Sequence, residues 1–373
     1  MFSKDDYYYM RKVLKLAAKG IGITSPDPLV GAILVKEGRI IASGYHKECG
    51  TPHAEVVAIN KIGRKAEGAT LYVNLEPCCH WGNNPPCTLP VISNGIKRVV
   101  VGMKDPNPLV KKCDSAKVLR DAGIQVDYGC LENESRKLNE IFVKYITTGL
   151  PFVILKSGMS LDGKIATAAG ASKWITSQAS RLMVHKLRSM VDAILVGIGT
   201  VIQDDPELTV RDVNSSQIKD PVRVIIDSSA RIPLNARVLN LSSKAATIVV
   251  VTELAAKEKI TLLEEKGAIV IKTKALDGKV NLSELITILG ERKLTSLMVE
   301  GGGTINSSFF NAGIIDKVLF FIAPKIIGGK DSPTPIDGAG ILSMADVSNL
   351  NNVSFTQIGD DILVEGYISS LIK

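Results

Sequence analysis

The chain has 373 residues, 45% of them hydrophobic and 22% charged, with a formal net charge of +7. This length allows two domains with separate cores, and since no run of about 18 apolar residues occurs, we expect no membrane-spanning segment. The basic residues are spread along the chain without a long block. That favours a phosphorylated small ligand over nucleic acid, although a mildly basic chain is equally compatible with no charged partner.

The N-terminal segment, MFSKDDYYYMRKVLKLAAKG, lacks the layout of a secretory signal, because an acidic, tyrosine-rich start precedes an amphipathic pattern. We therefore expect a cytoplasmic protein. All six cysteines and three of the four histidines lie within the first 130 residues. In the cytoplasm such clustering indicates metal ligands or catalytic groups more than disulfides.

Short apolar runs of strand length alternate with helical patterns along the chain. Expected strands cover 29–35, 70–75, 98–103, 152–157, 192–197, 222–227, 246–251 and 296–301, and helical periods cover 54–66, 115–123, 133–149 and 180–190. This alternation predicts α/β domains with mainly parallel sheets. A helix that ends at Gly149, just before Pro151, marks the boundary. We predict one domain over residues 1–148 and a second over 149–373.

The tripeptide HAE, residues 53–55, opens a predicted helix, and Cys78 and Cys87 follow, each directly after a proline. One histidine and two cysteines form a ligand set that zinc accepts, with the fourth tetrahedral position open to water. Glu55 is too near His53 to share the metal comfortably, but it can pass a proton from zinc-bound water to a leaving amine. This pattern is typical of zinc deaminases that act on nucleobases.

The eight residues between the two cysteines, CHWGNNPP, form a predicted loop that projects from the site. Cys79 and His80 within it are alternative ligands, and a closed structural zinc site would use one of them as its fourth ligand. Such a site has no need of Glu55. A disulfide is the least expected interpretation in this compartment.

In the second half, LMVEGGGTINSSFF is a predicted strand, three glycines (Gly301 to Gly303) and a helix from about Thr304. Backbone N–H groups at such a helix start can bind phosphate. The segment lacks the G-x-G-x-x-G pattern, so a tight strand-to-helix turn explains it equally well. Further Asp, Arg and Gly residues follow other predicted strands, where ligands bind in open α/β sheets.

Eight motifs together resemble the bifunctional deaminase–reductases of riboflavin biosynthesis over nearly the whole chain. They are SPDPLVGAILV, GYHKECGTPHAEVVAI, EPCCHWGNNPPCTLPVI, VGMKDPNPLV, LKSGMSLDGKIA, SKWITS, VHKLRSMVDAILVGIGTVIQDDPELTVR and APKIIGG. The resemblance implies a cytidine-deaminase-like α/β/α domain followed by a dihydrofolate-reductase-like α/β domain. It implies zinc-dependent hydrolytic deamination of a diaminopyrimidinone ribosylamine phosphate, then NADPH reduction of the ribosyl group to ribityl. It also implies a homo-oligomer that binds a small phosphorylated pyrimidine, not nucleic acid or membrane.

The resemblance also assigns residues to these roles. It puts the zinc ligands on His53, Cys78 and Cys87, proton transfer on Glu55, and deaminase substrate contacts on Asp27, His46, His80 and Asn83. Reductase substrate contacts fall on Ser172, Arg188, Leu208, Arg211 and Glu300, with Arg188 and Arg211 on the phosphate. NADPH contacts fall on Gly158, Trp174, Thr200, Asp204, Ser228, Gly302, Gly303, Thr304, Ile305, Asn306, Ser307 and Ser308.

Some of these residues have simpler interpretations. His46 is also explained as a histidine in a turn, and Trp174 as an ordinary core residue. Asp162 and Lys156 are expected at the floor of the reductase pocket, but Asp162 also fits a simple Asp-Gly turn.

The chain departs from the family pattern in the deaminase half. Asp27 replaces a usual Asn, and Asn83 and Asn84 replace a basic residue and a Thr. Asn83 keeps a hydrogen-bond donor, but the charge-assisted part of phosphate binding is gone unless Lys111 or Lys112 replaces it. Two alternatives follow: an active reductase with an altered or impaired deaminase, and, more distantly, a nucleic-acid-editing deaminase.

Overall fold

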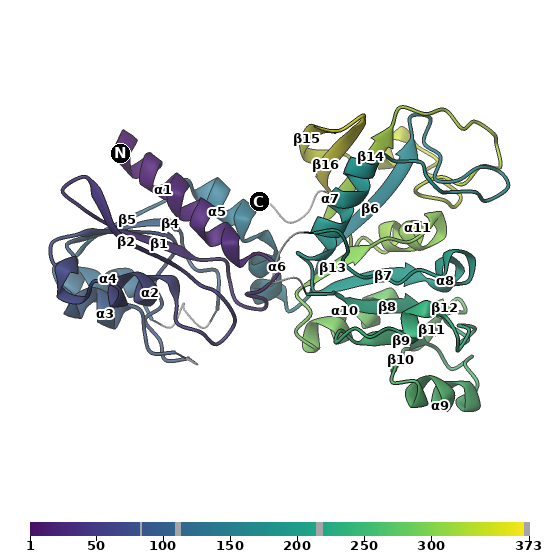
Figure 1. Cartoon of the computed structure of the whole chain (residues 1–373), viewed down its shortest axis with the longest axis horizontal. Coiled ribbons are helices and arrows are strands. Elements are labelled where there is room, and N and C mark those ends of the chain that lie inside the picture. The colour runs from purple at the N-terminus through teal and green to yellow at the C-terminus, as the bar shows by residue number, and fades with distance from the viewer. Residues whose placement is uncertain (83, 109–112, 214–218, 369–373) are drawn as a thin grey trace. The chain divides into compact units, whose positions relative to one another are not determined.

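The structure, a computed structural model, describes residues 1–82, 84–108, 113–213 and 219–368. It divides into two compact units, Met1–Gly149 and Leu150–Lys373, each with its own large sheet (Figure 1). The helix before the division ends at Gly149, whose φ of 74° is left-handed and whose N–H donates to the Tyr145 carbonyl at 2.8 Å. This is the glycine cap expected from the sequence. Among the described residues, no helix is long and apolar enough to cross a membrane.

The first unit contains a five-stranded sheet in the order β2-β1-β3-β4-β5. Its strands are β1 (Gly31–Lys36), β2 (Arg39–Tyr45), β3 (Thr70–Leu75), β4 (Arg98–Met103) and β5 (Gln125–Tyr128). β3, β4 and β5 are parallel, whereas β1 runs antiparallel to β2 and β3. Glu37 and Gly38, with φ values of 53° and 71°, form the two-residue turn between β1 and β2. The expectation of mainly parallel pairing is therefore wrong for this edge of the sheet.

Helices cover both faces of this sheet, because alternate strand residues point to opposite sides. On one face, α1 (Lys4–Ala17) buries Met10 and Val13 against Ile33, Tyr72 and Val100. The other face packs against α2 (Ala54–Asn60), α3 (Thr88–Ser93) and α4 (Ser115–Asp121) (Figure 1). The result is the expected three-layer α/β/α arrangement.

A buried carboxylate fixes α1 to the sheet. Asp6 is 2% exposed and accepts hydrogen bonds from Arg98 and from the Tyr72 hydroxyl, each at 2.8 Å. It also completes a capping box with Ser3. Burial raises the pKa of Asp6, but hydrogen bonds from Arg98, Ser3 and Tyr72 outweigh this effect and lower the pKa to about 2.

The single helix expected over 133–149 is two helices, α5 (Glu132–Leu138) and α6 (Glu140–Thr148). They meet at Asn139, whose φ of −104° lies outside the helical region. Its buried side-chain amide binds the N–H and the carbonyl of Leu29, at 2.8 and 3.0 Å. A long-range hydrogen-bonded contact therefore overrides the local helical pattern.

The second unit contains a nine-stranded sheet in the order β10-β9-β8-β7-β13-β6-β14-β16-β15. The strands are β6 (Phe152–Ser160), β7 (Ala193–Gly197), β8 (Val222–Ile226), β9 (Thr247–Val251), β10 (Ile269–Lys272), β13 (Ser296–Val299), β14 (Lys317–Ala323), β15 (Leu350–Ile358) and β16 (Asp361–Ile368). β10 through β14 in this order are parallel, as expected, and β16 and β15 add an antiparallel edge.

Helices of the second unit pack against its sheet and contribute apolar side chains to its core. They are α7 (Gln178–Arg188), α8 (Ile198–Asp204), α9 (Lys257–Glu265), α10 (Leu282–Glu291) and α11 (Gly303–Asn311), and a small separate sheet pairs β11 (Ala275–Leu276) with β12 (Lys279–Val280). Leu285 and Leu289 of α10 and Phe309 of α11 are fully buried in one cluster with Leu155 and Leu195 of the sheet.

The junction between β13 and α11 depends on two of its three glycines. A Cβ atom on Gly301 would lie 2.6 Å from the Ile305 side chain, and one on Gly303 would lie 2.3 Å from the Asp337 carboxylate. A Cβ on Gly302 would meet no atom within 4 Å. Close packing therefore requires Gly301 and Gly303, and it brings the first turn of α11 to the carboxyl end of the sheet.

Candidate active sites

Three ligand-type side chains converge just beyond the end of β3 in the first unit. His53 is the N-cap of α2, Cys87 is the N-cap of α3, and Cys78 follows β3. Their ligand atoms all lie within 4.8 Å of one another. Nδ1 of His53 is 3.1 Å from Sγ of Cys87 and 3.6 Å from Sγ of Cys78. One imidazole and two thiols form a set that suits catalytic zinc, because a fourth tetrahedral position remains for a reacting group.

Hydrogen bonds link the protonation of these three groups. The hydrogen bond with Cys87 lowers the pKa of Cys78 to about 4, which favours the thiolate form of Cys78. The hydrogen bond with Cys78 raises the pKa of both partners: that of His53 to about 9, and that of Cys87 well above its ordinary value. A thiolate is the form of cysteine that binds zinc, and metal binding displaces the protons of the other ligands.

Glu55 lies in the first turn of α2 and is 3% exposed. Its Oε2 atom has no hydrogen-bond partner among the described residues, which is unusual for a buried carboxylate oxygen. Burial raises the pKa of Glu55, so its carboxylate takes up a proton more readily than an exposed one. An unpartnered acceptor beside three ligand atoms fits a proton-donating group at the fourth metal position.

Asp27 and His46 form a pair next to His53, Cys78 and Cys87, which together are called the metal-ligand group below. Nε2 of His46 lies 3.1 Å from Oδ2 of Asp27, and Nδ1 lies 3.4 Å from the Pro52 carbonyl oxygen. The His46 ring packs edge-on against the His53 ring, with 5.6 Å between centroids. Burial raises the pKa of Asp27, but the hydrogen bond and charge of His46 give a net lowering. His46 therefore contacts Asp27 and His53 as well as the nearby turn at Pro52.

Asn83, in the loop between the two cysteines, lies outside the described residues, as do Lys111 and Lys112. Nδ1 of His80 is buried and has no partner in the described part of the chain. The Asn84 side chain donates to the Thr51 carbonyl at 3.1 Å and so ties this loop to the turn before His53.

Cys79 is not a member of the metal-ligand group. It forms a disulfide with Cys113, with 6.0 Å between Cα atoms and 34 residues between them in sequence. The expectation against a disulfide in this stretch is therefore wrong. Its partner lies in a separate loop, and no local pattern in the sequence links the two.

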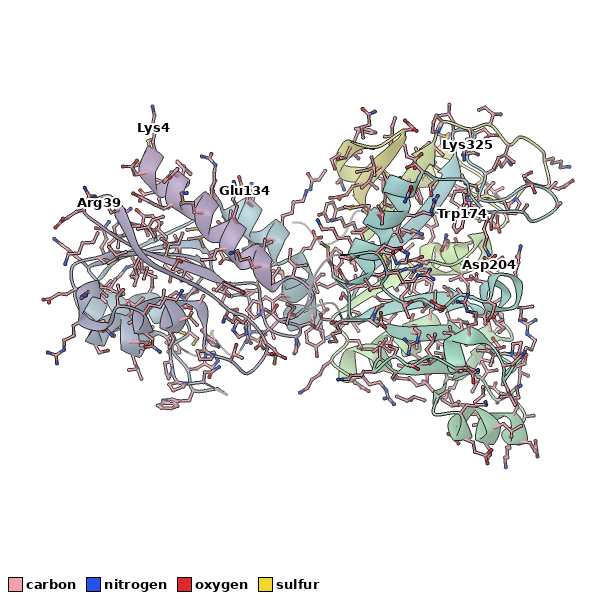
Figure 2. The ribbon with its side chains drawn as sticks, in the orientation of Figure 1. Lys4, Arg39, Glu134, Trp174, Asp204 and Lys325 are labelled. Carbon is pink, nitrogen blue, oxygen red and sulfur yellow. A yellow bond between two sulfur atoms is a disulfide. The ribbon has the colours of Figure 1, made fainter. Side chains whose placement is uncertain are left out.

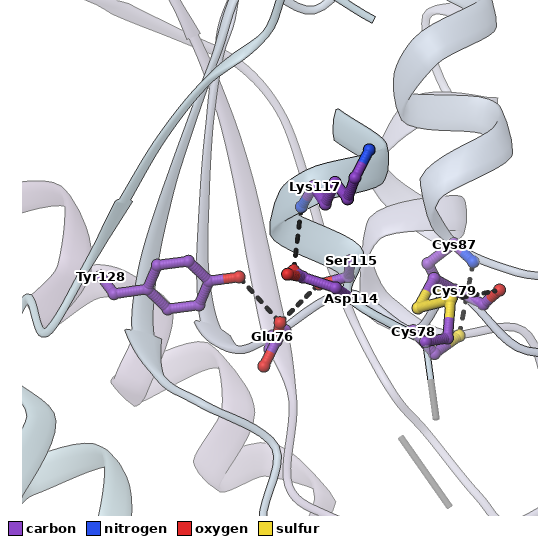
Figure 3. Close-up of a disulfide and its surroundings, with 9 residues drawn as sticks. Glu76, Cys78, Cys79, Cys87, Asp114, Ser115, Lys117 and Tyr128 are labelled. Atoms are coloured by element: carbon purple, nitrogen blue, oxygen red, sulfur yellow. Dashed lines mark hydrogen bonds between the residues drawn. A yellow bond between two sulfur atoms is a disulfide. The ribbon is translucent and has the colours of Figure 1, made fainter. Parts of the chain in front are cut away.

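A polar network behind the metal-ligand group was not predicted from the sequence. Oε1 of Glu76 accepts hydrogen bonds from the Ser115 and Tyr128 hydroxyls at 2.5 and 2.8 Å, and Oε2 accepts from the Asp105 N–H at 3.1 Å. Figure 3 shows Glu76 between Tyr128 and Ser115, with Cys78 and Cys87 beside the disulfide. Burial, with a contribution from Glu76, raises the pKa of Asp105 to about 6. The only sequence signal was the position of Glu76, two residues before Cys78.

The second unit holds a cavity of about 630 Å³. All five residues expected to contact the reductase substrate line it: Ser172, Arg188, Leu208, Arg211 and Glu300. Six expected NADPH residues line it too: Gly158, Trp174, Thr200, Asp204, Gly302 and Gly303. Trp174 and Asp204 lie on the same side of the unit (Figure 2). Trp174 is 65% exposed, with the Arg181 guanidinium 4.5 Å from its ring centroid, so the core interpretation of this residue is wrong.

Glu300 follows β13 directly and forms ion pairs with two cations that line this cavity. It accepts two hydrogen bonds from the Arg188 guanidinium, both at 2.9 Å, and one from Lys156 at 3.2 Å. Burial raises the pKa of Glu300, but the charges of Arg188 and Lys156 outweigh burial and hold the pKa below its ordinary range. Arg188 also donates to the Thr209 carbonyl at 3.2 Å. The sequence assigned Arg188 to a phosphate, and this pairing with a carboxylate was not foreseen.

Six expected NADPH residues do not line the cavity. Five of them continue α11 beyond its first residue: Thr304, Ile305, Asn306, Ser307 and Ser308. The sixth, Ser228, follows β8, and its carbonyl accepts from the N–H of Thr252 at 3.0 Å. Asp162 also lies outside the lining and accepts from the N–H groups of Ile327 and Gly328, at 3.0 and 2.6 Å. The Asp162–Gly163 turn is present, since the Gly163 N–H donates to the Ser160 carbonyl at 3.0 Å, but the bonds to Ile327 and Gly328 give Asp162 a long-range contact beyond that turn.

Comparison with known proteins identifies the family. The model of the RibD C-terminal domain matches residues 151–364, and that of the cytidine and deoxycytidylate deaminase zinc-binding region matches residues 3–103. The riboflavin biosynthesis protein RibD of Aquifex aeolicus is 46% identical, over 98% of this chain and 99% of that protein. RibD of Escherichia coli is 37% identical, over 96% and 98%. The chain belongs to the RibD family.

Solved structures of this family agree with the fold. RibD from Acinetobacter baumannii matches with a TM-score of 0.86 and 35% identity, over 98% of this chain and 99% of that one. A diaminohydroxyphosphoribosylaminopyrimidine deaminase/5-amino-6-(5-phosphoribosylamino)uracil reductase from Thermotoga maritima matches with a TM-score of 0.81 and 38% identity, with the same coverage. The protein is a bifunctional riboflavin biosynthesis enzyme, with a zinc-binding deaminase unit and an NADPH-dependent reductase unit. Neither alternative drawn from the sequence is favoured.

Proposed function

We propose that the first unit hydrolyses the amino group of 2,5-diamino-6-(5-phosphoribosylamino)pyrimidin-4(3H)-one, and that the second reduces the ribosyl group of the product to ribityl with NADPH. The observation that carries the first step is the buried Oε2 of Glu55, which lies beside His53, Cys78 and Cys87 and has no hydrogen-bond partner within the described ranges. The second step is supported by the cavity that Trp174 and the start of α11 line together with Glu300.

In the deaminase unit, His53, Cys78 and Cys87 would hold zinc, and the metal would supply a water molecule of lowered pKa. Glu55 is placed to accept a proton from the attacking water and to deliver it to the leaving amine, and its raised pKa favours this uptake. Asp27 offers a fixed acceptor to an N–H group of the pyrimidine. His46 holds that carboxylate in place.

His80, with Asn83, binds the substrate phosphate in this proposal. The buried Nδ1 of His80, without a partner among the described residues, supports this role. Asn84 positions the loop through Thr51. Because an amide donates weaker hydrogen bonds than a guanidinium or an ammonium group, we propose a weaker hold on the phosphate than in relatives with a basic residue.

In the reductase unit, Arg188 acts mainly by fixing Glu300, because three of its hydrogen bonds go to Glu300 and Thr209. Arg211 is 52% exposed and pairs with Glu207 through Nη1 alone, at 3.2 Å, so we assign its other guanidinium N–H groups to the substrate phosphate. The Trp174 ring offers an apolar face to NADPH, and the backbone at Gly302 and Gly303 offers the N–H groups of a helix start to its phosphates.

Glu55→Gln tests this division of labour. The change should stop ammonia release from the diaminopyrimidinone, while NADPH oxidation with the deaminated compound continues. Both reactions are measured on the full chain with zinc content checked. Loss of both activities in a variant that still unfolds cooperatively at the wild-type temperature contradicts the proposal.

We further propose a cytoplasmic homo-oligomer that binds neither nucleic acid nor membrane. Val353 and Phe355 of β15 and Ile362 of β16 are 40%, 72% and 47% exposed on the edge hairpin of the reductase sheet. Apolar side chains on an edge strand favour self-association. Light scattering after size-exclusion chromatography should show that Phe355→Glu lowers the mass of the particle. A wild-type monomer contradicts this proposal.

A further inference from the structure

The Cys79–Cys113 disulfide joins two loops of the deaminase unit. Both residues are partly exposed, in contrast to Cys87 and Cys130, which are buried. Their Cα separation of 6.0 Å lies within the range that disulfides span. The pair is therefore within reach of small thiols and disulfides. Cytoplasmic disulfides are usually transient, and many of them sense redox state.

Each cysteine stands next to a functional segment. Cys79 lies between Cys78 of the metal-ligand group and His80, the proposed phosphate ligand. Cys113 precedes Asp114, which caps α4 by accepting the Lys117 N–H at 2.9 Å (Figure 3). The bond therefore ties the Cys78–His80 segment to the start of α4.

The base of the same segment is anchored without the disulfide. Glu76 accepts hydrogen bonds from Ser115 and Tyr128, and the Cys78 carbonyl accepts from the Thr88 N–H at 3.2 Å. These contacts involve no thiol of Cys79 or Cys113, so breaking the S–S bond removes none of their donors or acceptors. Reduction therefore removes the covalent tie next to His80 and loosens the Cys79–His80 backbone between two anchors that do not depend on it, the base at Cys78 and the Asn84 hydrogen bond to Thr51.

We propose that Cys79 and Cys113 form a thiol–disulfide switch that sets the affinity of the deaminase unit for the substrate phosphate through His80. The inference rests on the proposed phosphate role of His80. In the oxidising direction, the two thiols react with a small disulfide such as oxidised glutathione. One S–S bond forms between the cysteines, the S–S bond of the oxidant breaks, and two molecules of reduced glutathione leave with the two protons. Excess reduced thiol reverses the exchange.

The oxidised form holds His80 in position, and the reduced form lets it move. We expect reduction to raise KM for the diaminopyrimidinone about tenfold, as for loss of much of one hydrogen bond to a charged group. The kcat of ammonia release and the zinc content stay constant, because the metal-ligand group has its own anchors. NADPH oxidation by the reductase unit does not respond.

The experiment equilibrates the full-length, zinc-loaded chain in glutathione buffers of graded redox ratio. Mass spectrometry after thiol alkylation follows the Cys79–Cys113 pair, while ammonia release and NADPH oxidation are measured in parallel. Cys113→Ser and Cys79→Ser should both fix KM at the reduced value in every buffer. Cys130→Ala, at a buried cysteine outside the site, should keep the full response.

Three results overturn the switch: no Cys79–Cys113 pair in the oxidising buffers, equal KM in both states, or a response that survives in Cys113→Ser. Loss of zinc on reduction overturns the claim that the metal-ligand group does not depend on the disulfide. Binding of ribose 5-phosphate is measured by calorimetry in both states. If ammonia release is absent throughout, the proposed function fails, while a redox-dependent Kd for this probe still supports the switch and a constant Kd rejects it.

Discussion

Two glutamates, Glu55 in the deaminase unit and Glu300 in the reductase unit, are withdrawn from solvent in opposite electrostatic surroundings. Glu55 has one oxygen without a partner in the described part of the chain, and burial raises its pKa. The pKa of Glu300 would also be raised by burial, but Arg188 and Lys156 lower it. Burial alone therefore does not define a role. Glu55, with an oxygen that no described residue neutralises, can exchange a proton. Glu300, paired with two cations, stays ionised and fixes the positions of Arg188 and Lys156.

The largest expected effect is on catalysis by Glu55. Glu55→Gln should lower the rate of ammonia release about 10³-fold, the usual scale for losing a general acid–base. Thermal unfolding should move little or to higher temperature, because a neutral amide costs less to bury than a carboxylate whose pKa burial already raises. If Glu55→Gln clearly lowers stability but releases ammonia at the normal rate, Glu55 has the structural role that we assign to Glu300, and the contrast fails.

Glu300→Gln should have the opposite signature. It leaves Arg188 and Lys156 without their anionic partner in a nearly buried position, which costs about 3 kcal/mol of unfolding free energy. Urea denaturation followed by circular dichroism measures this. Glu132→Gln is the control at an exposed pair, since the side chains of Glu132 and Arg136 are 44% and 48% exposed, against 7% for Glu300. It should cost less than about 1 kcal/mol.

Asp6 extends the comparison to a paired carboxylate far from either reaction. Its pKa is lowered to about 2 in the folded chain from an ordinary 3.8. A depressed folded-state pKa gives stability that is complete above pH 3.8 and is lost as the pH falls toward 2. Asp6→Asn should therefore cost about 2 kcal/mol at pH 7 and almost nothing near pH 2. Denaturation across this pH range checks the slope, and a pH-independent cost is the contrary result.

The smallest effect concerns the glycines beside Glu300. Gly303→Ala should lower reductase stability by about 1 kcal/mol, because the new methyl group displaces the Asp337 carboxylate. We take the low end of the range of about 1–3 kcal/mol for an added methyl group, because Asp337 lies in a loop. Gly302→Ala, where the methyl group meets nothing within 4 Å, should unfold at the wild-type temperature. Equal melting temperatures for the two variants contradict this packing argument.

Local patterns in the sequence predicted much of the fold and the identity of the metal-ligand group. β3 and β4 have the predicted bounds, because short apolar runs between turn residues leave few alternatives. His53, Cys78 and Cys87 were selected by residue type and spacing, and the structure brings their ligand atoms within 4.8 Å. Their role as zinc ligands stays a prediction until a metal is measured.

Features that depend on distant partners were missed. The break at Asn139 follows from hydrogen bonds to Leu29, 110 residues away. The pairing of Arg188 with Glu300 spans 112 residues, and that of Cys79 with Cys113 spans 34. No periodicity in the sequence encodes such contacts, since they arise only when the sheet brings the segments together. Of residues 302–308, all assigned to NADPH, Gly302 and Gly303 line the cavity, and the role of the other five stays a prediction.

The chain contains two tryptophans, one in each unit. Trp81 is 74% exposed in the loop beside His80, and Trp174 is 65% exposed in the reductase cavity. Each proposed binding site therefore carries its own intrinsic fluorophore. Trp81→Phe leaves an emission signal that reports on the reductase cavity, and Trp174→Phe leaves one that reports on the deaminase loop. Ligand binding to the two sites of one molecule can thus be followed separately by light, without labels and without turnover.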